Sequence, residues 1–343
     1  MLVRRLIYIS TINLLSKRAQ SIQVKRFVKS LSELSKKEGI DFKAFSLGQV
    51  PNKYKIYFKA RNKNLSNNRL LNNLYMVYYL FKNKHLKLRD SLYSRDLLLL
   101  FIFALLGFNA IYEFHHPSPP LNSILLKLFN LLPNTRIITI SNALKKFVLE
   151  NYCFYSKEIL VLPSAVEIKK YNETPKKELC RYEVGMESNK YYILHTGSPY
   201  KGRGIEKFVE LCKVSSDIFF IHIGGTIEEL EWLKFIAIKE DISNCLFLPN
   251  IDEELIIKYQ KGADLLFYII TNNYPTFWCC SPLKIPEYMA SGTPILASEI
   301  GAIPEIIDSN TAFLFDPYKS LKDILINAKS NPKLASNIAL MAR

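Results

Sequence analysis

Short apolar runs alternate with longer stretches of helical spacing along the whole chain. In the first half, strands are expected at 6–9, 110–114, 136–140 and 159–162, and helices at 21–36 and 141–151. In the second half, strands are expected at 191–195, 218–223, 245–248, 265–269 and 294–297, and helices at 205–213, 227–239, 253–261 and 283–291. Such alternation is typical of parallel sheets built from strand–helix–strand units, so the sequence predicts an α/β fold.

The stretch 169–190 is charged and lacks apolar periodicity, and we interpret it as a linker. It predicts two Rossmann-like domains, at 1–172 and 173–343, which we expect to face each other across a cleft. A chain of 343 residues is long enough for two such domains. In open α/β sheets, ligands bind beyond the carboxyl ends of the strands, where glycine turns and helix N-termini gather.

The most apolar segment, 97–112, is shorter than the roughly 20 residues that a spanning helix needs, and it contains Gly107 and Asn109. We interpret it as a core helix that runs into a strand; partial immersion in a membrane face is the alternative. At the start of the chain, Ser10, Thr11 and Asn13 interrupt the apolar stretch. A first strand is therefore expected there rather than a signal peptide.

Hydrophobic residues make up 49% of the chain and charged residues 22%, which excludes a disordered or fibrous protein. The net charge of +15 comes entirely from residues 1–100, which hold 21 Lys and Arg against 5 Asp and Glu. A positive field confined to one domain favours an anionic partner, and an anionic membrane surface is one candidate. A lysine-rich surface without a partner is the alternative. No nucleic-acid partner is expected, because the lysines belong to no recognisable recognition module.

The six cysteines form no CxxC pair and no zinc-finger spacing, so no metal site is expected and the thiols are expected to be reduced, as in the cytosol. His115 and His116 are adjacent at an expected strand end and should point to opposite sides, which disfavours joint metal binding. His115 could act in the cleft or serve structure alone. Glu113 faces the same way as His115 and could orient it.

The stretch 281–294 is the most informative part of the sequence for a candidate ligand-binding site. Ser281 is a good helix N-cap and Pro282 a good first helical residue, which would leave backbone N–H groups free for a phosphate. Lys284 adds a positive charge, and Glu287 on the same helical face could accept two hydrogen bonds from a diol such as ribose. A plain surface ion pair is the alternative. Pro286 implies either an irregular first turn or a helix that begins near it.

The segment SPLKIPEYMASGTPILAS at 281–298, followed by GAIPEII at 301–307, resembles the donor-binding segment of glycosyltransferase family four, the retaining GT-B enzymes. Further segments resemble motifs of that family in the same order: YSR at 93–95, IYEFH at 111–115, ISNAL at 140–144, VLPSAVE at 161–167 and TGSPYKGRGIE at 196–206. The likeness covers residues 3–325, and its C-terminal segment is the most specific part.

The resemblance implies a GT-B fold and a retaining, metal-independent glycosyltransferase without a cofactor. The donor would be a nucleotide-diphosphate sugar and the acceptor a glycan or a lipid-linked precursor, in cell-surface polysaccharide or lipopolysaccharide-type biosynthesis. Catalytic roles are implied for His115, Arg203 and Lys284. Donor binding is implied for Gly197, Lys201, Arg203, Ser281, Pro282, Leu283, Lys284 and Glu287. Lys284, with Arg203 or Lys201, would stabilise the charge of the leaving diphosphate, and Glu287 would bind the ribose.

We expect such an enzyme to be cytoplasmic and to act at the inner face of a membrane.

Two departures from the family pattern bear on activity. Cys279 stands where the family has the first acidic residue of a paired-glutamate motif, and Ser198 stands where the phosphate loop has a basic residue. The alternative is therefore a catalytically weak or inactive protein that binds nucleotide sugars.

Overall fold

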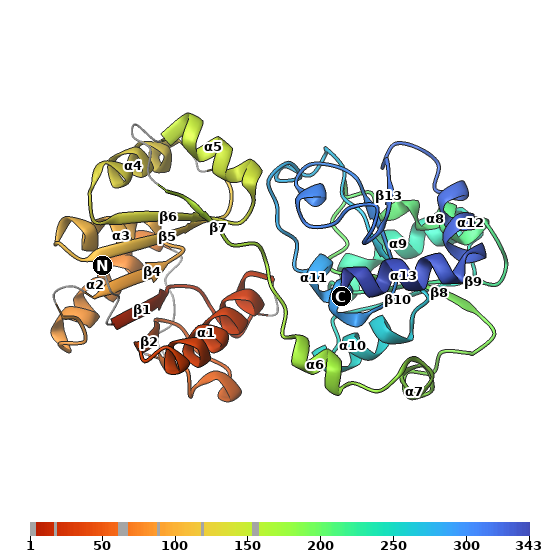
Figure 1. Cartoon of the computed structure of the whole chain (residues 1–343), viewed down its shortest axis with the longest axis horizontal. Coiled ribbons are helices and arrows are strands. Elements are labelled where there is room, and N and C mark those ends of the chain that lie inside the picture. Colours follow the sequence, from red (N-terminus) through yellow and green to blue (C-terminus); the bar gives the residue numbers. More distant parts are fainter. Residues whose placement is uncertain (1–4, 17–18, 61–67, 88–89, 118–119, 153–157) are drawn as a thin grey trace. The chain divides into compact units, whose positions relative to one another are not determined.

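The protein is described by a computed structural model that covers residues 5–16, 19–60, 68–87, 90–117, 120–152 and 158–343. The chain divides into two units, Met1–Ser164 and Ala165–Arg343. The division thus falls after residue 164, whereas the sequence pattern placed it after residue 172. Each unit is an α/β sandwich around one parallel sheet (Figure 1), which confirms the predicted fold class of two Rossmann-like domains.

The first unit contains a seven-stranded sheet in the order β3-β2-β1-β4-β5-β6-β7, and every neighbouring pair in it is parallel. The strand order reverses between β1 and β4, so the loops after these two strands leave the sheet in different directions and open a crevice. The strands are β1 (Arg5–Ser10), β2 (Asp41–Ser46), β3 (Phe58–Ala60), β4 (Ser91–Ser94), β5 (Asn109–Phe114), β6 (Thr135–Thr139) and β7 (Leu160–Val161).

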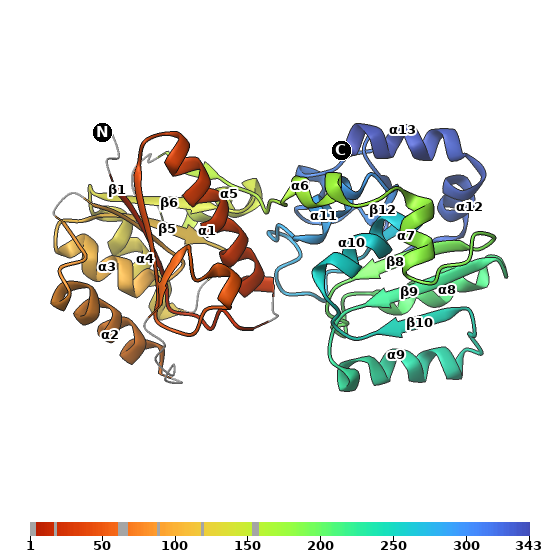
Figure 2. The same ribbon diagram turned by 90° about the horizontal axis from the view of Figure 1, so that it is seen from below.

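The helices of the first unit lie on both faces of its sheet. One face is covered by α1, and α2, α3 and α4 follow one another over the opposite face (Figure 1, Figure 2). Asn68 caps α2 and Asp96 caps α3 through their side-chain oxygens. The helices are α1 (Ala19–Lys37), η1 (Asn52–Tyr54), α2 (Arg69–Lys82), α3 (Leu97–Leu105), α4 (Pro120–Leu131) and α5 (Asn142–Tyr152).

The second unit contains a six-stranded parallel sheet in the order β10-β9-β8-β11-β12-β13, which reverses between β8 and β11. Its strands are β8 (Tyr191–Thr196), β9 (Ile218–Ile223), β10 (Cys245–Leu248), β11 (Leu265–Tyr268), β12 (Ile295–Ser298) and β13 (Phe313–Phe315). Its helices are α6 (Ile168–Glu173), α7 (Lys177–Glu183), η2 (Ile205–Lys207), α8 (Phe208–Lys213), α9 (Ile227–Lys239), α10 (Glu253–Gly262), α11 (Lys284–Ser291), η3 (Ile303–Glu305), α12 (Lys322–Ser330) and α13 (Pro332–Ala342).

The core of the second unit has two layers because successive residues of a strand point to opposite faces. Ile193 of β8 and Phe267 of β11 pack with α8 and α12 on one side. Leu194 and Tyr268 pack with α11 on the other side. The central strands are therefore buried on both faces, which is why they are continuous apolar runs in the sequence.

The prediction that 169–190 is a linker is wrong. This stretch forms α6 and α7, and α7 packs against α10. Cys180 is fully buried, and Arg181 binds the Asp264 carboxylate at 2.5 Å. The few apolar residues of α7 stand among lysines and glutamates, so a seven-residue helix shows too little periodicity to be recognised.

The apolar segment 97–112 forms α3 and the start of β5, as predicted. Leu99, Leu100 and Phe103 of α3 are fully buried. Within the described ranges, no helix combines the length and the apolar character needed to cross a bilayer.

Candidate donor and acceptor sites

Two glycine-containing loops meet at the carboxyl ends of β8 and β9. The Gly197 N–H donates to the Ile223 carbonyl at 2.9 Å. A Cβ on Gly224 would lie 2.1 Å from the Gly197 carbonyl oxygen, and the φ of Gly224 is +141°. Only glycine allows this approach, so the Gly224-Gly225 turn is required where it stands. It holds the backbone of the loop after β8 in one position.

Arg203 lies on the same loop and stacks on aromatic rings. Its Cζ is 4.4 Å from the centroid of Tyr274 and 5.6 Å from that of Tyr200. Its buried Nε has no hydrogen-bond partner within the described part of the chain. The guanidinium is thus oriented by cation–π contacts rather than by a carboxylate, which leaves N–H donors for an anion. Lys201, two residues earlier, is exposed.

The loop is also fixed to the segment after β11. The Thr271 hydroxyl donates to the Gly202 carbonyl at 2.6 Å. A Cβ on Gly204 would approach Thr271 Cγ2 to 2.8 Å and Ile269 Cδ1 to 2.9 Å. The two segments on either side of the β8/β11 reversal are therefore packed without a gap between them.

Helix α11 begins at Lys284, and Leu283 is its N-cap. The prediction that Ser281 is the N-cap and Pro282 the first helical residue is wrong. Pro286 gives the reason: as the third helical residue it needs no intrahelical N–H donor, whereas a helix begun at Pro282 would place it in the interior. The first helical bond runs from the Glu287 N–H to the Leu283 carbonyl at 3.3 Å. Ser281 is buried and precedes the helix, and Pro282 and Leu283 are half-buried.

Lys284 and Glu287 face the same side of the first turn of α11, as predicted. The Lys284 ammonium donates to Glu287 Oε2 at 2.7 Å. The Glu287 side chain is only 5% exposed, whereas that of Lys284 is 26% exposed. A nearly buried carboxylate beside a helix N-terminus and a lysine forms a polar site with both signs of charge.

A pair of buried histidines lies beneath this site and was not predicted. His195 Nδ1 is 2.9 Å from His222 Nδ1, and His222 Nε2 is 3.3 Å from the Gly224 carbonyl. A carbonyl accepts only, so His222 donates from Nε2 and His195 donates to His222. Burial lowers the pKa of His222 to about 4. Burial, followed by the charges of His222, Arg203 and Lys284, lowers the pKa of His195 well below its ordinary value.

Arg203 and Lys284 thus both lower the pKa of the same imidazole, that of His195, so the two cations lie in the same part of the second unit. The sequence held a weak signal for the pair. Each histidine stands two residues before a glycine that follows its strand, in HTG and HIGG. The sequence of one strand does not show which residue of another strand lies beside it in the sheet, so the two histidines could not be recognised as neighbours.

In the first unit, His115 is held by a buried carboxylate. Glu113 Oε1 accepts from His115 Nε2 at 2.7 Å and from Arg95 at 2.8 Å, and its Oε2 accepts from the Tyr93 hydroxyl at 2.8 Å. Burial opposes the charge of Glu113, but the His115 hydrogen bond and Arg95 outweigh it and lower the Glu113 pKa to about 2. Burial and Arg95 lower the pKa of His115. The neutral ring donates from Nε2, so Nδ1 is left as a hydrogen-bond acceptor.

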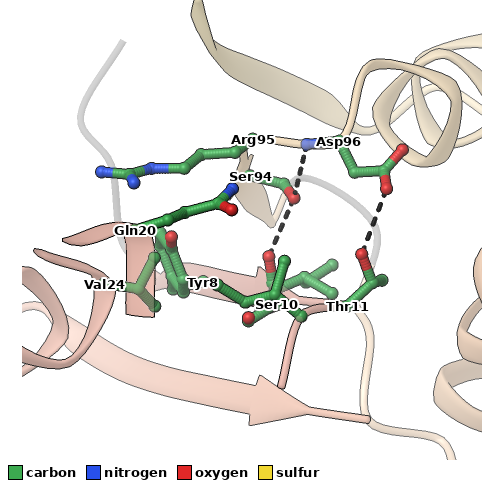
Figure 3. Close-up of a pocket in the computed structure, with 10 residues that line it drawn as sticks. Tyr8, Ser10, Thr11, Gln20, Val24, Ser94, Arg95 and Asp96 are labelled. Carbon is green, nitrogen blue, oxygen red and sulfur yellow. Dashed lines mark hydrogen bonds between the residues drawn. The ribbon is translucent and has the colours of Figure 1, made fainter. Parts of the chain in front are cut away.

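A small pocket opens at the carboxyl ends of β1 and β4, at the reversal of strand order (Figure 3). Thr11 donates to Asp96 at 3.1 Å, and Ser94 donates to the Ile9 carbonyl at 2.8 Å. The buried hydroxyl of Ser10 has no partner among the described residues. These polar groups, with Arg95 and Gln20 at the rim, suit a hydroxyl-rich ligand.

No cluster of three or more His, Cys, Asp or Glu side chains in the described ranges is arranged to hold a metal ion. His116 is exposed, and its Nδ1 contacts the Pro117 carbonyl at 3.1 Å. The five cysteines that the structure describes are free thiols; Cys153 lies outside the described residues.

Residues 177–343 match the family model described as glycosyl transferases group 1. The match covers nearly all of the second unit, which therefore belongs to this family. The match contains β8 to β13 and every predicted donor-binding residue. Among the nine predicted site residues, His115 alone belongs to the first unit.

Solved structures of glycosyltransferases share the fold. A glycosyltransferase from Rickettsia africae ESF-5 is 21% identical with a TM-score of 0.77, and the match covers 98% of this chain and 92% of that one. WaaG, a glycosyltransferase involved in lipopolysaccharide biosynthesis, is 14% identical with a TM-score of 0.71 over 98% and 94% of the two chains. Anabaena HepE in complex with UDP and glucose is 14% identical with a TM-score of 0.68 over 98% and 93%. The fold of these solved structures therefore extends over both units.

Curated relatives match over about half of the chain. The alpha-galactosylglucosyldiacylglycerol synthase of Streptococcus pneumoniae is 21% identical over 194 residues, which are 54% of this chain and 50% of the synthase. The O-antigen chain mannosyltransferase RfbU of Salmonella typhimurium is 24% identical over 206 residues, 58% of this chain and 52% of that protein. The chain thus spans about half the length of the curated relatives that it matches.

Proposed function

We propose that this group 1 family member transfers a sugar from a nucleotide-diphosphate sugar to a glycan or a lipid-linked acceptor. Family membership supports a transferase. Donor binding is supported by fold neighbours whose structures contain UDP or UDP-glucose. The names of the relatives, a glycolipid synthase and an O-antigen mannosyltransferase, support an acceptor in cell-surface glycan synthesis.

The observation that carries the proposal is the first turn of α11, where Lys284 and the nearly buried Glu287 are paired at 2.7 Å. Helix N–H groups and Lys284 suit the diphosphate, and Arg203 carries a second cation with unused donors. Glu287 suits the two hydroxyls of ribose, because a carboxylate can accept both hydrogen bonds. Negative charge that develops on the leaving diphosphate would be stabilised by groups already in position.

Transfer with retention of the anomeric configuration and without a metal ion is part of this proposal. Metal independence is supported by the two cations, which can take the part that a divalent ion plays on other diphosphates. Retention is supported by the resemblance of the motifs at 281–298 and 196–206 to retaining enzymes. An NMR assignment of the first-formed product anomer tests it, and inversion would contradict it.

His115 is proposed to bind a hydroxyl of the substrate through Nδ1. This role is supported by its orientation, since Glu113 engages Nε2 at 2.7 Å and the ring is neutral near pH 7. The acceptor is proposed to use the pocket after β1 and β4, whose polar groups are hydroxyls, an amide, one carboxylate and the Arg95 guanidinium. Cytoplasmic action beside a membrane also remains a proposal.

A protein that binds the donor without transferring the sugar is the second candidate, and one observation favours it. Cys279 is fully buried, and burial raises the pKa of its thiol to about 12. A neutral thiol cannot make the contacts of the acidic residue that the family has at this position. This candidate predicts donor binding with neither transfer nor hydrolysis.

The decisive experiment screens purified protein for nucleoside diphosphate release from UDP-, GDP- and ADP-sugars in EDTA, with and without a bacterial lipid extract as acceptor. We expect release with one class of donor and its loss in Lys284→Ala. Glu187→Gln is the matched control, because Glu187 forms an exposed i,i+3 pair with Lys190 in the same unit. Binding of a donor without release would support the second candidate, and no binding of any donor would contradict both.

A further inference from the structure

The outer surface of α2, α3 and α4 carries large apolar side chains that the fold leaves uncovered. Along α2 they recur at helical spacing, so that one stripe faces solvent. These residues are 44 to 55% exposed: Leu70, Leu71, Leu74, Tyr78 and Phe81. The inward side of the same helix buries Met76 and Leu80 together with Asn72 and Asn73. Helix α2 thus carries apolar side chains on both its inward and its outward side, unlike an ordinary surface helix, whose outward side is polar.

The neighbouring helices continue the surface. On α4, Ile124, Leu128 and Leu131 are exposed at i, i+4 and i+7. At the end of α3, Leu105 and Leu106 are exposed. The three helices lie side by side on one face of the sheet (Figure 1, Figure 2). We call these ten residues, on α2, at the end of α3 and on α4, the outer apolar face. An apolar surface shared by three helices marks an interaction site.

Charge on the outer apolar face has one sign. Between residues 68 and 149 the chain contains three acidic residues, Asp90, Asp96 and Glu113, and all three are buried. Basic side chains are exposed at the end of α2, where Lys82 and Lys84 lie, and on α4 at Lys127. Lys82 Nζ lies 5.4 Å from the centroid of the exposed Tyr78 ring. Lysines beside aromatic and aliphatic side chains, without carboxylates, suit an interface with anionic lipid.

We propose that the outer apolar face docks the first unit on a membrane surface that contains anionic lipid. A second copy of the chain fits less well, because two such faces would bring lysines against lysines with no carboxylate to pair them. The second unit offers a contrast. Phe235 and Ile238 of α9 are also exposed, but Glu228 and Glu231 lie on the same helix. Apolar side chains among carboxylates are not expected to bind an anionic bilayer.

The test is co-sedimentation of the full chain with vesicles of phosphatidylcholine alone and of phosphatidylcholine with phosphatidylglycerol in equal parts. Leu71→Gln/Leu74→Gln removes apolar contacts without adding charge, and Lys82→Gln/Lys84→Gln removes charge alone. Phe235→Gln/Ile238→Gln is the matched control. We expect binding to the anionic vesicles that each α2 variant weakens about tenfold, while the control binds as the unaltered chain does.

Circular dichroism and thermal melting establish that each variant is folded, and Ile124→Gln/Leu128→Gln on α4 repeats the test on a second helix. Failure of the unaltered chain to bind anionic vesicles, or binding that none of these substitutions weakens, would overturn the proposal. Light scattering measures the oligomeric state and so tests the alternative that the face binds a second copy of the chain. A dimer that the α2 variants convert to a monomer, without vesicle binding, would assign the face to a second copy instead. The vesicle assay needs no nucleotide sugar, so its result is independent of the proposed transfer reaction.

Discussion

The Tyr288 hydroxyl accepts a hydrogen bond from the Thr196 N–H at 2.8 Å and so joins the middle of α11 to the end of β8. Tyr288 is fully buried. The residue before Gly197 and the helix that carries Lys284 and Glu287 are therefore fixed to each other through one phenol. The positions of the two parts of the candidate donor site depend on this contact.

Tyr288→Phe should leave the Thr196 N–H buried without this partner. A buried unsatisfied donor costs about 1 to 3 kcal/mol, so we expect a loss of stability of that size and weaker donor binding. Urea unfolding measures the first and calorimetry the second. Tyr182→Phe, at a side chain that is 82% exposed, is the control and should change neither. Equal stability of the two variants would remove Tyr288 from this role.

Gly224→Ala should be among the most damaging single-methyl changes in the chain. The new Cβ would meet the Gly197 carbonyl oxygen at 2.1 Å, and the backbone has a φ of +141°. We expect a loss of more than about 4 kcal/mol, or failure to fold. At Gly39 the φ is +68° and nothing lies within 4 Å of an added Cβ, so Gly39→Ala should cost only about 1 kcal/mol. Similar losses at both glycines would contradict the close approach.

The buried histidine pair should make stability depend on pH above the range where carboxylates titrate. The pKa of His222 falls from an ordinary 6.5 to about 4 in the folded protein. Its contribution is fully present above pH 6.5 and is lost as the pH falls from 6.5 toward 4, because the unfolded chain takes up the proton first. The loss is on the order of 3 kcal/mol. Urea unfolding at pH 7.5, 5.5 and 4.5 should show it, with a flatter profile for His195→Gln/His222→Gln.

The hydrogen bonds of the Glu113 carboxylate to His115, Arg95 and Tyr93 should make stability depend on pH in a lower range. The pKa of Glu113 falls from an ordinary 4.5 to about 2. Its stabilisation, on the order of 3 kcal/mol, is present above pH 4.5 and is lost as the pH falls from 4.5 toward 2. Glu113→Gln should lower stability near pH 7 and flatten the profile in that range. A variant that keeps the unaltered profile there would show that Glu113 is not the group responsible.

The sequence predicted five of the six strands of the second unit, all but the three-residue β13, and the helical face shared by Lys284 and Glu287. Apolar runs and helical spacing involve residues that are close in the sequence, so they can be recognised without the structure. It misplaced the start of α11, since Ser281 and Pro282 are good start signals and only Pro286 argues against them. It missed the His195–His222 pair, whose members are joined by sheet register. It also took α6 and α7 for a linker, because their few buried residues, such as Cys180, lie among charged ones.

Arg203 and Lys201 should differ in their effect on donor binding. Arg203 stacks on Tyr274 and has an unused buried N–H, whereas Lys201 is exposed. Arg203→Ala should weaken nucleoside diphosphate binding by roughly 1.5 to 3 kcal/mol, the usual scale of hydrogen bonds to charged groups. Lys201→Ala should weaken it by less than about 1 kcal/mol, as for an exposed charge. Calorimetric titration compares the two, and a larger effect at Lys201 would reverse the assignment.

Titration calorimetry of the full chain with UDP, GDP and ADP in the presence of EDTA tests the central claim most directly. We predict that one of these nucleotides binds without a metal and that Glu287→Gln weakens it by roughly 1 to 3 kcal/mol, because a charge-assisted hydrogen bond to the ribose is lost. Binding of none of the three, or an affinity that Glu287→Gln leaves unchanged, would contradict a donor site on the first turn of α11.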